Sequence, residues 1–169
     1  MTALCMNDNV NILRIIRGTT VDGPGFRTSI YFAGCRHRCP GCHNPQSWDF
    51  NAGKTMGIDE ILEVIEEEDY DVTLTGGDPL YNPDFVICLA DRIHSLGHNI
   101  WLYTGFTWEE ILNSHALYDA VSHIDVIVDS PFVLSQRDPD LAFRGSSNQR
   151  IIDVAQSIKK GGINLWRRE

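Results

Sequence analysis

The sequence lacks the features that would place it in a membrane, on the secretory route or on nucleic acid. None of its apolar runs approaches the roughly 20 residues that a membrane-spanning helix needs. Residues 1–11 contain no basic segment followed by an apolar one, so we expect no secretory signal and a cytoplasmic location. The 14 basic and 23 acidic residues leave a formal net charge of −9. This charge disfavours chain-wide binding to nucleic acid or anionic lipid.

An internal repeat, a low-complexity tract and a Ser/Gly-rich linker are also missing from the sequence. The 169 residues, 43% of them hydrophobic, suffice for one folded core. We therefore expect a single domain over residues 1–169. Its expected parts are an N-terminal strand and turn in 1–33, a cysteine-bearing cluster loop in 34–50, βα units in 51–160 and a C-terminal tail in 161–169.

The hydrophobic pattern predicts helices that alternate with short strands. Helical spacing of apolar residues begins at Ile58 and again at Val86, and a capping box of Thr107 and Glu110 predicts another helix start. Buried strands are expected at 71–75, 99–103 and 124–128, with a strand and short helix within 150–160. Alternation of this kind predicts parallel βαβ units. About four or five units are too few for a closed eight-fold barrel, so we expect an α/β fold with a partial, open parallel β/α barrel.

Glycines and polar residues follow the predicted strands at comparable points. Gly34-Cys35, Gly76-Gly77, Thr104-Gly105 and Asp129 each come at or just after a strand end. In parallel α/β sheets, ligands bind beyond the carboxyl ends of the strands. The sequence therefore predicts that these segments share one site.

Three of the five cysteines stand close together, as Cys35, Cys39 and Cys42 in a C-x3-C-x2-C spacing. An odd count with one tight cluster is a poor disulfide framework and indicates metal binding or catalysis. Three thiolates can hold a [4Fe–4S] cluster with one iron left open, and an open iron can chelate a small molecule. The alternative is a structural zinc site with His37 or His43 as fourth ligand, in a zinc-stabilised α/β binding module.

This cysteine spacing after a strand resembles the signature of the radical S-adenosylmethionine (SAM) enzymes. The surrounding segments resemble one subfamily, the activating component of anaerobic (class III) ribonucleoside-triphosphate reductase, over about residues 21–150. They are VDGPGFR at 21–27, TGGDPL at 75–80, WLYTG at 101–105, IDVIVDSPF at 124–132 and RGSSNQR at 144–150. The activase of pyruvate formate-lyase shares VDGPG but is a longer chain. Another short radical SAM enzyme, either a different glycyl-radical activase or a small-molecule modifier, is the alternative reading.

The resemblance implies roles for two groups of residues. The metal ligands would be Cys35, Cys39 and Cys42, which would hold a [4Fe–4S] cluster whose open iron chelates SAM. The SAM-binding residues would be Gly41, Cys42 and His43 on the adenine side, and the motif Gly76, Gly77 and Asp78. Glycines at a strand end let backbone carbonyls approach an ammonium group closely.

The resemblance also implies the reaction and its partners. An electron donor such as flavodoxin would reduce the cluster, and SAM would be cleaved to methionine and a 5′-deoxyadenosyl radical. That radical would take a hydrogen from a glycine on the large subunit of the reductase. No general acid or base is required, so no catalytic residue is expected beyond the cluster.

Two positions depart from what the radical SAM pattern leads us to expect. Gly41 stands where many of these enzymes have an aromatic residue that packs beside adenine, so His43 is expected to contribute that packing. Asp129-Ser130 stands where Asp-Gly is usual, which leaves the role of Asp129 open.

Overall fold

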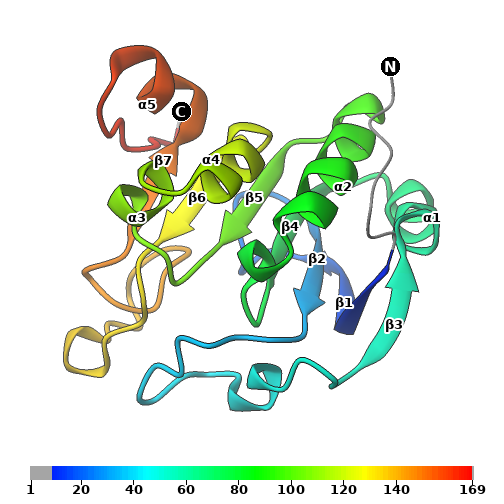
Figure 1. Ribbon diagram of the computed structural model, residues 1–169, viewed down its shortest axis with the longest axis horizontal. Coiled ribbons are helices and arrows are strands. Elements are labelled where there is room, and N and C mark those ends of the chain that lie inside the picture. Colours follow the sequence, from blue (N-terminus) through cyan, green and yellow to red (C-terminus); the bar gives the residue numbers. More distant parts are fainter. Residues whose placement is uncertain (1–8, 169) are drawn as a thin grey trace.

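A seven-stranded sheet of order β3-β1-β2-β4-β5-β6-β7 forms the centre of the computed structural model, which describes residues 9–168 (Figure 1). The strands are β1 (Asn9–Thr19), β2 (Arg27–Phe32), β3 (Lys54–Gly57), β4 (Asp71–Gly76), β5 (Ile100–Tyr103), β6 (Val126–Asp129) and β7 (Arg150–Asp153). The α-helices are α1 (Ile58–Glu68), α2 (Pro83–Ser95), α3 (Trp108–Leu112), α4 (His115–Ser122) and α5 (Val154–Lys160). Short 3-10 turns lie at Pro45–Trp48, Pro79–Tyr81 and Leu134–Gln136. No helix of the described residues is long and apolar enough to cross a membrane.

The predicted alternation of strands and helices is confirmed, and four central strands are parallel. Strands β2, β4, β5 and β6 pair in parallel, while β1, β3 and β7 pair antiparallel with their neighbours. The sheet is therefore mixed and not closed, rather than parallel throughout. Thr107 accepts from the backbone N–H of Glu110 at 3.2 Å, so the predicted capping box at the start of α3 is confirmed.

Strand β7 runs against β6 because the chain returns at the carboxyl end of β6. In the register, Asp129 pairs with Arg150, so the end of one strand lies beside the start of the next. The connecting segment 130–149 contains a 3-10 turn but no α-helix, whereas the connection between parallel strands is usually a crossover helix. The expected strand and helix within 150–160 are present, with β7 in the opposite direction to β6.

The two faces of the sheet carry different side chains because strand residues alternate. One face packs on the helices through a fully buried apolar layer that includes Ile30, Leu74, Leu102 and Ile127. The opposite face carries Tyr31, Thr75 and Tyr103 near the carboxyl ends of the strands. Further back on that face, Trp101 packs against Phe143 and Trp166. The helical face forms the core, and the other face is free to shape a site.

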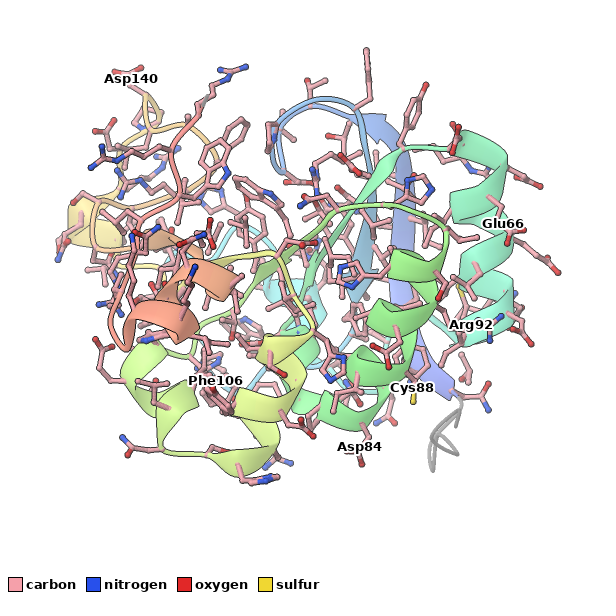
Figure 2. The ribbon with its side chains drawn as sticks, turned by 90° about the horizontal axis from the view of Figure 1, so that it is seen from above. Glu66, Asp84, Cys88, Arg92, Phe106 and Asp140 are labelled. Atoms are coloured by element: carbon pink, nitrogen blue, oxygen red, sulfur yellow. The ribbon has the colours of Figure 1, made fainter. Side chains whose placement is uncertain are left out.

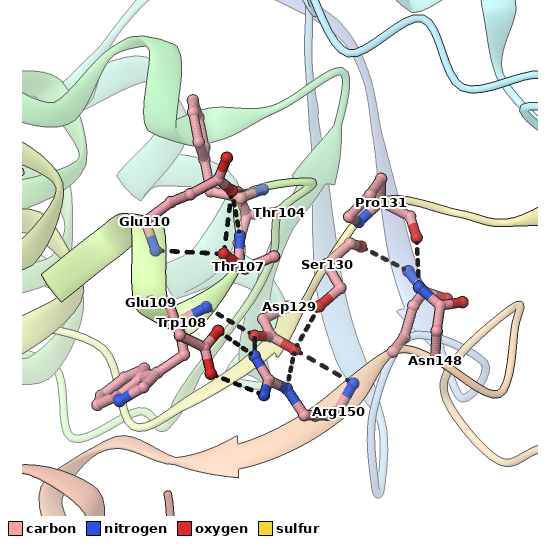
Figure 3. A network of polar contacts seen from close by, with 12 residues as sticks. Thr104, Thr107, Trp108, Glu109, Glu110, Asp129, Ser130, Pro131, Asn148 and Arg150 are labelled. Atoms are coloured by element: carbon pink, nitrogen blue, oxygen red, sulfur yellow. Dashed lines mark hydrogen bonds and ion pairs between the residues drawn. The ribbon is translucent and has the colours of Figure 1, made fainter. Parts of the chain in front are cut away.

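Asp129, whose role the sequence left open, ties three elements together (Figure 3). Its carboxylate is completely buried and accepts from the backbone N–H of Trp108 at 2.8 Å and from Nε of Arg150 at 3.1 Å. Nη2 of Arg150 also donates to Oε2 of Glu109 at 2.8 Å. The hydrogen bonds to Asp129 and Glu109 raise the pKa of the Arg150 guanidinium. Asp129 therefore joins β6, β7 and the start of α3.

The neighbouring Ser130 explains why Asp-Gly would suit this place. Its φ is +77°, in the left-handed region where a residue with a Cβ bears about 1–2 kcal/mol of strain. Its hydroxyl donates to Asp129 Oδ1 at 3.1 Å, and its carbonyl accepts from Gln149 Nε2 at 3.3 Å. Hydrogen bonds thus keep Ser130 in a backbone conformation that glycine would adopt without strain.

We expect replacement of Asp129 to lower the stability of the fold. Asp129→Ala leaves the buried N–H of Trp108 without its acceptor and Arg150 without its buried partner, so we expect a loss of about 2–4 kcal/mol in the free energy of unfolding. Urea denaturation measures the change. The control is Asp140→Ala, an exposed carboxylate at the outer edge of the molecule (Figure 2), which should change stability by no more than about 0.5 kcal/mol. Equal effects of the two substitutions would contradict this role for Asp129.

Candidate functional site

A cavity of about 360 Å³ opens at the carboxyl ends of the parallel strands. Its walls come from the cysteine loop, from the ends of β2, β4 and β5, and from the segment 130–149. Figure 1 shows the loop passing beneath these strand ends. A larger surface hollow of about 970 Å³ beside Pro24 and the C-terminal segment contains none of the predicted site residues. The chemistry-bearing residues therefore point to the smaller cavity.

The three clustered cysteines all line this cavity, as their spacing predicts. Left-handed backbone at Arg38 and Gly41, with φ of +48° and +77°, lets the loop turn tightly between them. The backbone N–H of Cys42 donates to the carbonyl of Cys39 at 3.0 Å. Burial raises the pKa of the Cys35 thiol to about 11 and also raises that of Cys39. The loop thus gathers three half-buried thiols on one side of the cavity.

Backbone contacts hold the start of this loop against the end of β4. The N–H of Gly77 donates to the carbonyl of Phe32 at 2.7 Å, and the N–H of Asp78 donates to the carbonyl of Gly34 at 2.9 Å. A Cβ on Gly77 would lie 2.4 Å from the carbonyl oxygen of Gly34 and 3.0 Å from that of Ser47. Gly77 is therefore a glycine because two backbone segments meet there.

The predicted SAM-binding residues divide into those that line the cavity and those that do not. Cys42, His43, Gly76 and Gly77 are among its walls.

Two of the predicted residues lie outside the wall. Gly41 turns away from the cavity, toward Leu134 of segment 130–149, where an added Cβ would lie 2.8 Å from Leu134 Cδ1. The Asp78 carboxylate is fully buried behind the wall, where it accepts from the N–H of Leu80 at 3.0 Å. The sequence motifs alone do not reveal that Gly41 lies against Leu134 or that the Asp78 carboxylate binds the N–H of Leu80.

The strands add a wall of polar side chains that our sequence reasoning missed. Tyr31, Thr75 and Tyr103 stand on the same face of neighbouring strands, and Tyr31 pairs with Thr75 in the register. The Tyr31 hydroxyl donates to Asp22 of the VDGPG turn at 2.9 Å. Burial, reinforced by Asp22, raises the pKa of Tyr31 to about 12, so its hydroxyl stays protonated. The available signal was the two-residue alternation, which sets these side chains opposite the apolar ones.

The RGSSNQR segment completes the cavity from the other side. Gly145 and Gln149 line it together with Phe132, whose ring meets the His43 ring edge-on at 5.1 Å between centroids. The Gln149 side-chain carbonyl accepts from the N–H groups of Gly145 and Ser146 at 2.9 and 3.1 Å. This internal bonding gives the segment a defined shape beside the cysteine loop.

Comparison with known proteins identifies the family. Residues 21–152 match the model of a 4Fe-4S single cluster domain. The anaerobic ribonucleoside-triphosphate reductase-activating protein of Escherichia coli K12 is 38% identical over 139 residues, which cover 76% of this chain and 89% of the relative. The chain belongs to this family of activating proteins. The resemblance seen in the sequence is thereby confirmed.

Other members of the activating-protein family are similarly related. The Salmonella typhi protein is 37% identical over 139 residues, covering 76% of this chain and 89% of its own length. The protein of Enterobacteria phage T4 is 33% identical over 159 residues, covering 89% of this chain and 99% of its own length. The family therefore spans nearly the whole of this chain.

The cavity residues fit an iron–sulfur cluster by the chemistry of their donors. The loop offers three soft sulfur donors across one cavity, the number that leaves one iron of a cubane open. Asn44, also in the wall, has a buried side-chain nitrogen without a hydrogen-bond partner in the described chain.

The ligand assignment predicts how iron content responds to substitution. Cys35→Ala, Cys39→Ala and Cys42→Ala should each lose the cluster, because each removes one of three thiolates. Iron and sulfide analysis after anaerobic reconstitution measures this, with about four of each expected in the unmodified chain. The control is Cys88→Ala, on helix α2 outside the cavity (Figure 2), which should keep the cluster. A full iron complement in any of the three loop variants would contradict the assignment.

The close approach at Gly77 predicts a second effect. Gly77→Ala forces its Cβ into the carbonyls of Gly34 and Ser47, so we expect a loss of about 2 kcal/mol or more in unfolding free energy and a lower iron content. Gly162→Ala is the matched control, because its Cβ would meet nothing within 4 Å. Denaturation and iron analysis of both variants provide the measurement. If Gly77→Ala behaved like Gly162→Ala, the backbone contact would not hold the loop.

Proposed function

We propose that this chain activates anaerobic ribonucleoside-triphosphate reductase by generating a glycyl radical on its large subunit. Cys35, Cys39 and Cys42 would hold a [4Fe–4S] cluster, and SAM would occupy the cavity beside it. The observation that carries the proposal is the meeting of the three cysteines with Gly76-Gly77 in one cavity. The relatives' name, anaerobic ribonucleoside-triphosphate reductase-activating protein, supports the choice of target.

The residues of this chain would bind and orient the reactants. Held by Cys35, Cys39 and Cys42, the cluster would supply the electron for reductive cleavage of SAM, and SAM would supply the group that takes a hydrogen from the glycine. Backbone carbonyls at Gly76 and Gly77 would accept from the amino group of SAM. Gly41, Cys42 and His43 would lie on its adenine side, where the contact between His43 and Phe132 fixes the imidazole ring. No side chain needs to move a proton in this scheme.

We propose that residues 1–169 form one domain whose open sheet is a partial β/α barrel of the radical SAM type. The four parallel strands and the cavity at their carboxyl ends support this proposal. An open barrel leaves the site accessible to a glycine carried on a large protein.

The decisive experiment combines reduced, reconstituted protein, SAM and the large reductase subunit under anaerobic conditions. We expect a glycyl-radical doublet by electron paramagnetic resonance (EPR) and 5′-deoxyadenosine in comparable amount. The control is Cys39→Ala, which should give neither product. SAM cleavage with an intact cluster but without a doublet would remove the reductase as target.

The electron donor is tested in the same assay. We propose a flavodoxin-type protein, so reduced flavodoxin should replace the chemical reductant and give a doublet of similar size. A doublet with the chemical reductant but none with reduced flavodoxin would refute this donor and leave the activase function standing.

A further inference from the structure

His37, between the first two cysteines, has a defined partner behind the cavity wall. Its Nε2 lies 2.8 Å from Oδ2 of Asp78, a distance at which Nε2–H donates to the carboxylate. The ring packs edge-on against Phe106 at 4.6 Å and tilts against Tyr81 at 5.5 Å between centroids. Its side chain is only 17% exposed. The histidine is therefore held in one orientation, and it connects the cysteine loop to the body of the protein.

The Asp78 carboxylate is a hydrogen-bond hub, because it accepts hydrogen bonds from several parts of the fold. Besides His37, its Oδ2 accepts from the Thr104 hydroxyl at 2.8 Å and from the N–H of Gly105 at 2.9 Å, both at the end of β5. Its Oδ1 accepts from the N–H of Leu80 at 3.0 Å. With both oxygens engaged and no exposed surface, this carboxylate does not face the cavity. Its contribution to the site therefore passes through the groups that it binds.

The space for the His37 ring is provided by a glycine. A Cβ on Gly105 would lie 2.5 Å from Cδ2 and 2.8 Å from Nε2 of His37. The φ of Gly105 is not in the left-handed region, so alanine suits this backbone and the obstacle is the ring itself. Gly105 and His37 therefore fit together as a pair at the end of β5.

We propose that His37 is a positioning residue that, through Asp78, fixes the Cys35–Cys39 segment relative to Gly76-Gly77. This inference rests on the proposed function, because it takes the cavity as the SAM site. SAM would be held at two places, by the open iron on the loop and by backbone at the end of β4. The hydrogen bond between His37 and Asp78 joins those two places, so it sets their separation.

The test measures SAM binding to the anaerobically reconstituted full chain. SAM is titrated while the EPR spectrum of the reduced cluster is followed, because coordination at the open iron changes that spectrum. We expect His37→Leu to keep its iron and to bind SAM about tenfold more weakly, as the loss of one hydrogen bond to a buried carboxylate implies. His37→Gln presents an amide N–H at a similar reach, so it should restore binding to within about threefold of the unmodified chain.

His94→Leu is the matched control. His94 lies 3.0 Å from the Asp125 carboxylate in a similar His–Asp pair, but outside the cavity. Removing this pair should leave iron content and SAM affinity unchanged.

Two results would overturn the inference. Unmodified SAM affinity in His37→Leu would show that the hydrogen bond does not set the separation. Equal weakening in His37→Leu and His37→Gln would assign the effect to ring packing.

Gly105→Ala provides a second route if His37→Leu fails to fold. Its Cβ displaces the His37 ring, so we expect about the same tenfold weakening in the otherwise unmodified chain. In a His37→Ala background, the added methyl has no ring to displace and should cause no further loss. Unchanged SAM affinity in Gly105→Ala, or fully additive losses in the double variant, would contradict the inference.

Measurements on the unmodified chain distinguish failure of the proposed function from failure of the positioning role of His37. If it binds no cluster or no SAM, the proposed function fails. If it binds both and the His37 variants bind equally well, only the positioning role fails.

Discussion

The backbone contact between Gly77 and Gly34 is the constraint on which the site depends. The N–H of Asp78 donates to the carbonyl of Gly34 at 2.9 Å, and the space between the segments leaves no room for a Cβ at position 77. This contact places the start of the cysteine loop over the end of β4. The cavity, the buried Asp78 hub and the orientation of His37 all require that placement. The close approach of Gly34 and Gly77 therefore joins the cysteine loop and the sheet in one site.

Much of this arrangement could be predicted because its signals are local. The spacing of Cys35, Cys39 and Cys42 lies within one loop, and apolar periodicity marks α1, α2 and the central strands. The capping box at Thr107 needs only its own four residues. The rule that ligands bind at the carboxyl ends of parallel strands predicted convergence on one site. Cys35, Gly76-Gly77 and Thr104-Gly105 do line one cavity, whereas Gly34 and the buried Asp129 lie outside its wall.

The remaining features depend on pairings between distant residues. Strand β3 is recognised as a strand through its pairing with β1. The direction of β7 follows from the return of the chain at the carboxyl end of β6, where Arg150 pairs with Asp129. The motif TGGDPL does not reveal that the Asp78 side chain turns inward while its glycine neighbours line the cavity. Tyr31 and Tyr103 were visible as strand residues, but their place in the wall requires the register of neighbouring strands.

The alternation of side chains along the strands places residues that pack in the core on one face of the sheet and residues that line the cavity on the other. Residues such as Leu74 and Leu102 touch the helices, while Thr75 and Tyr103, next to them in the chain, face the cavity. Residues that are adjacent in the sequence therefore serve different purposes, one in the packed core and the other in the cavity wall. A substitution on the helical face therefore acts on the free energy of unfolding, whereas a substitution one residue along the same strand acts on the shape and polarity of the cavity.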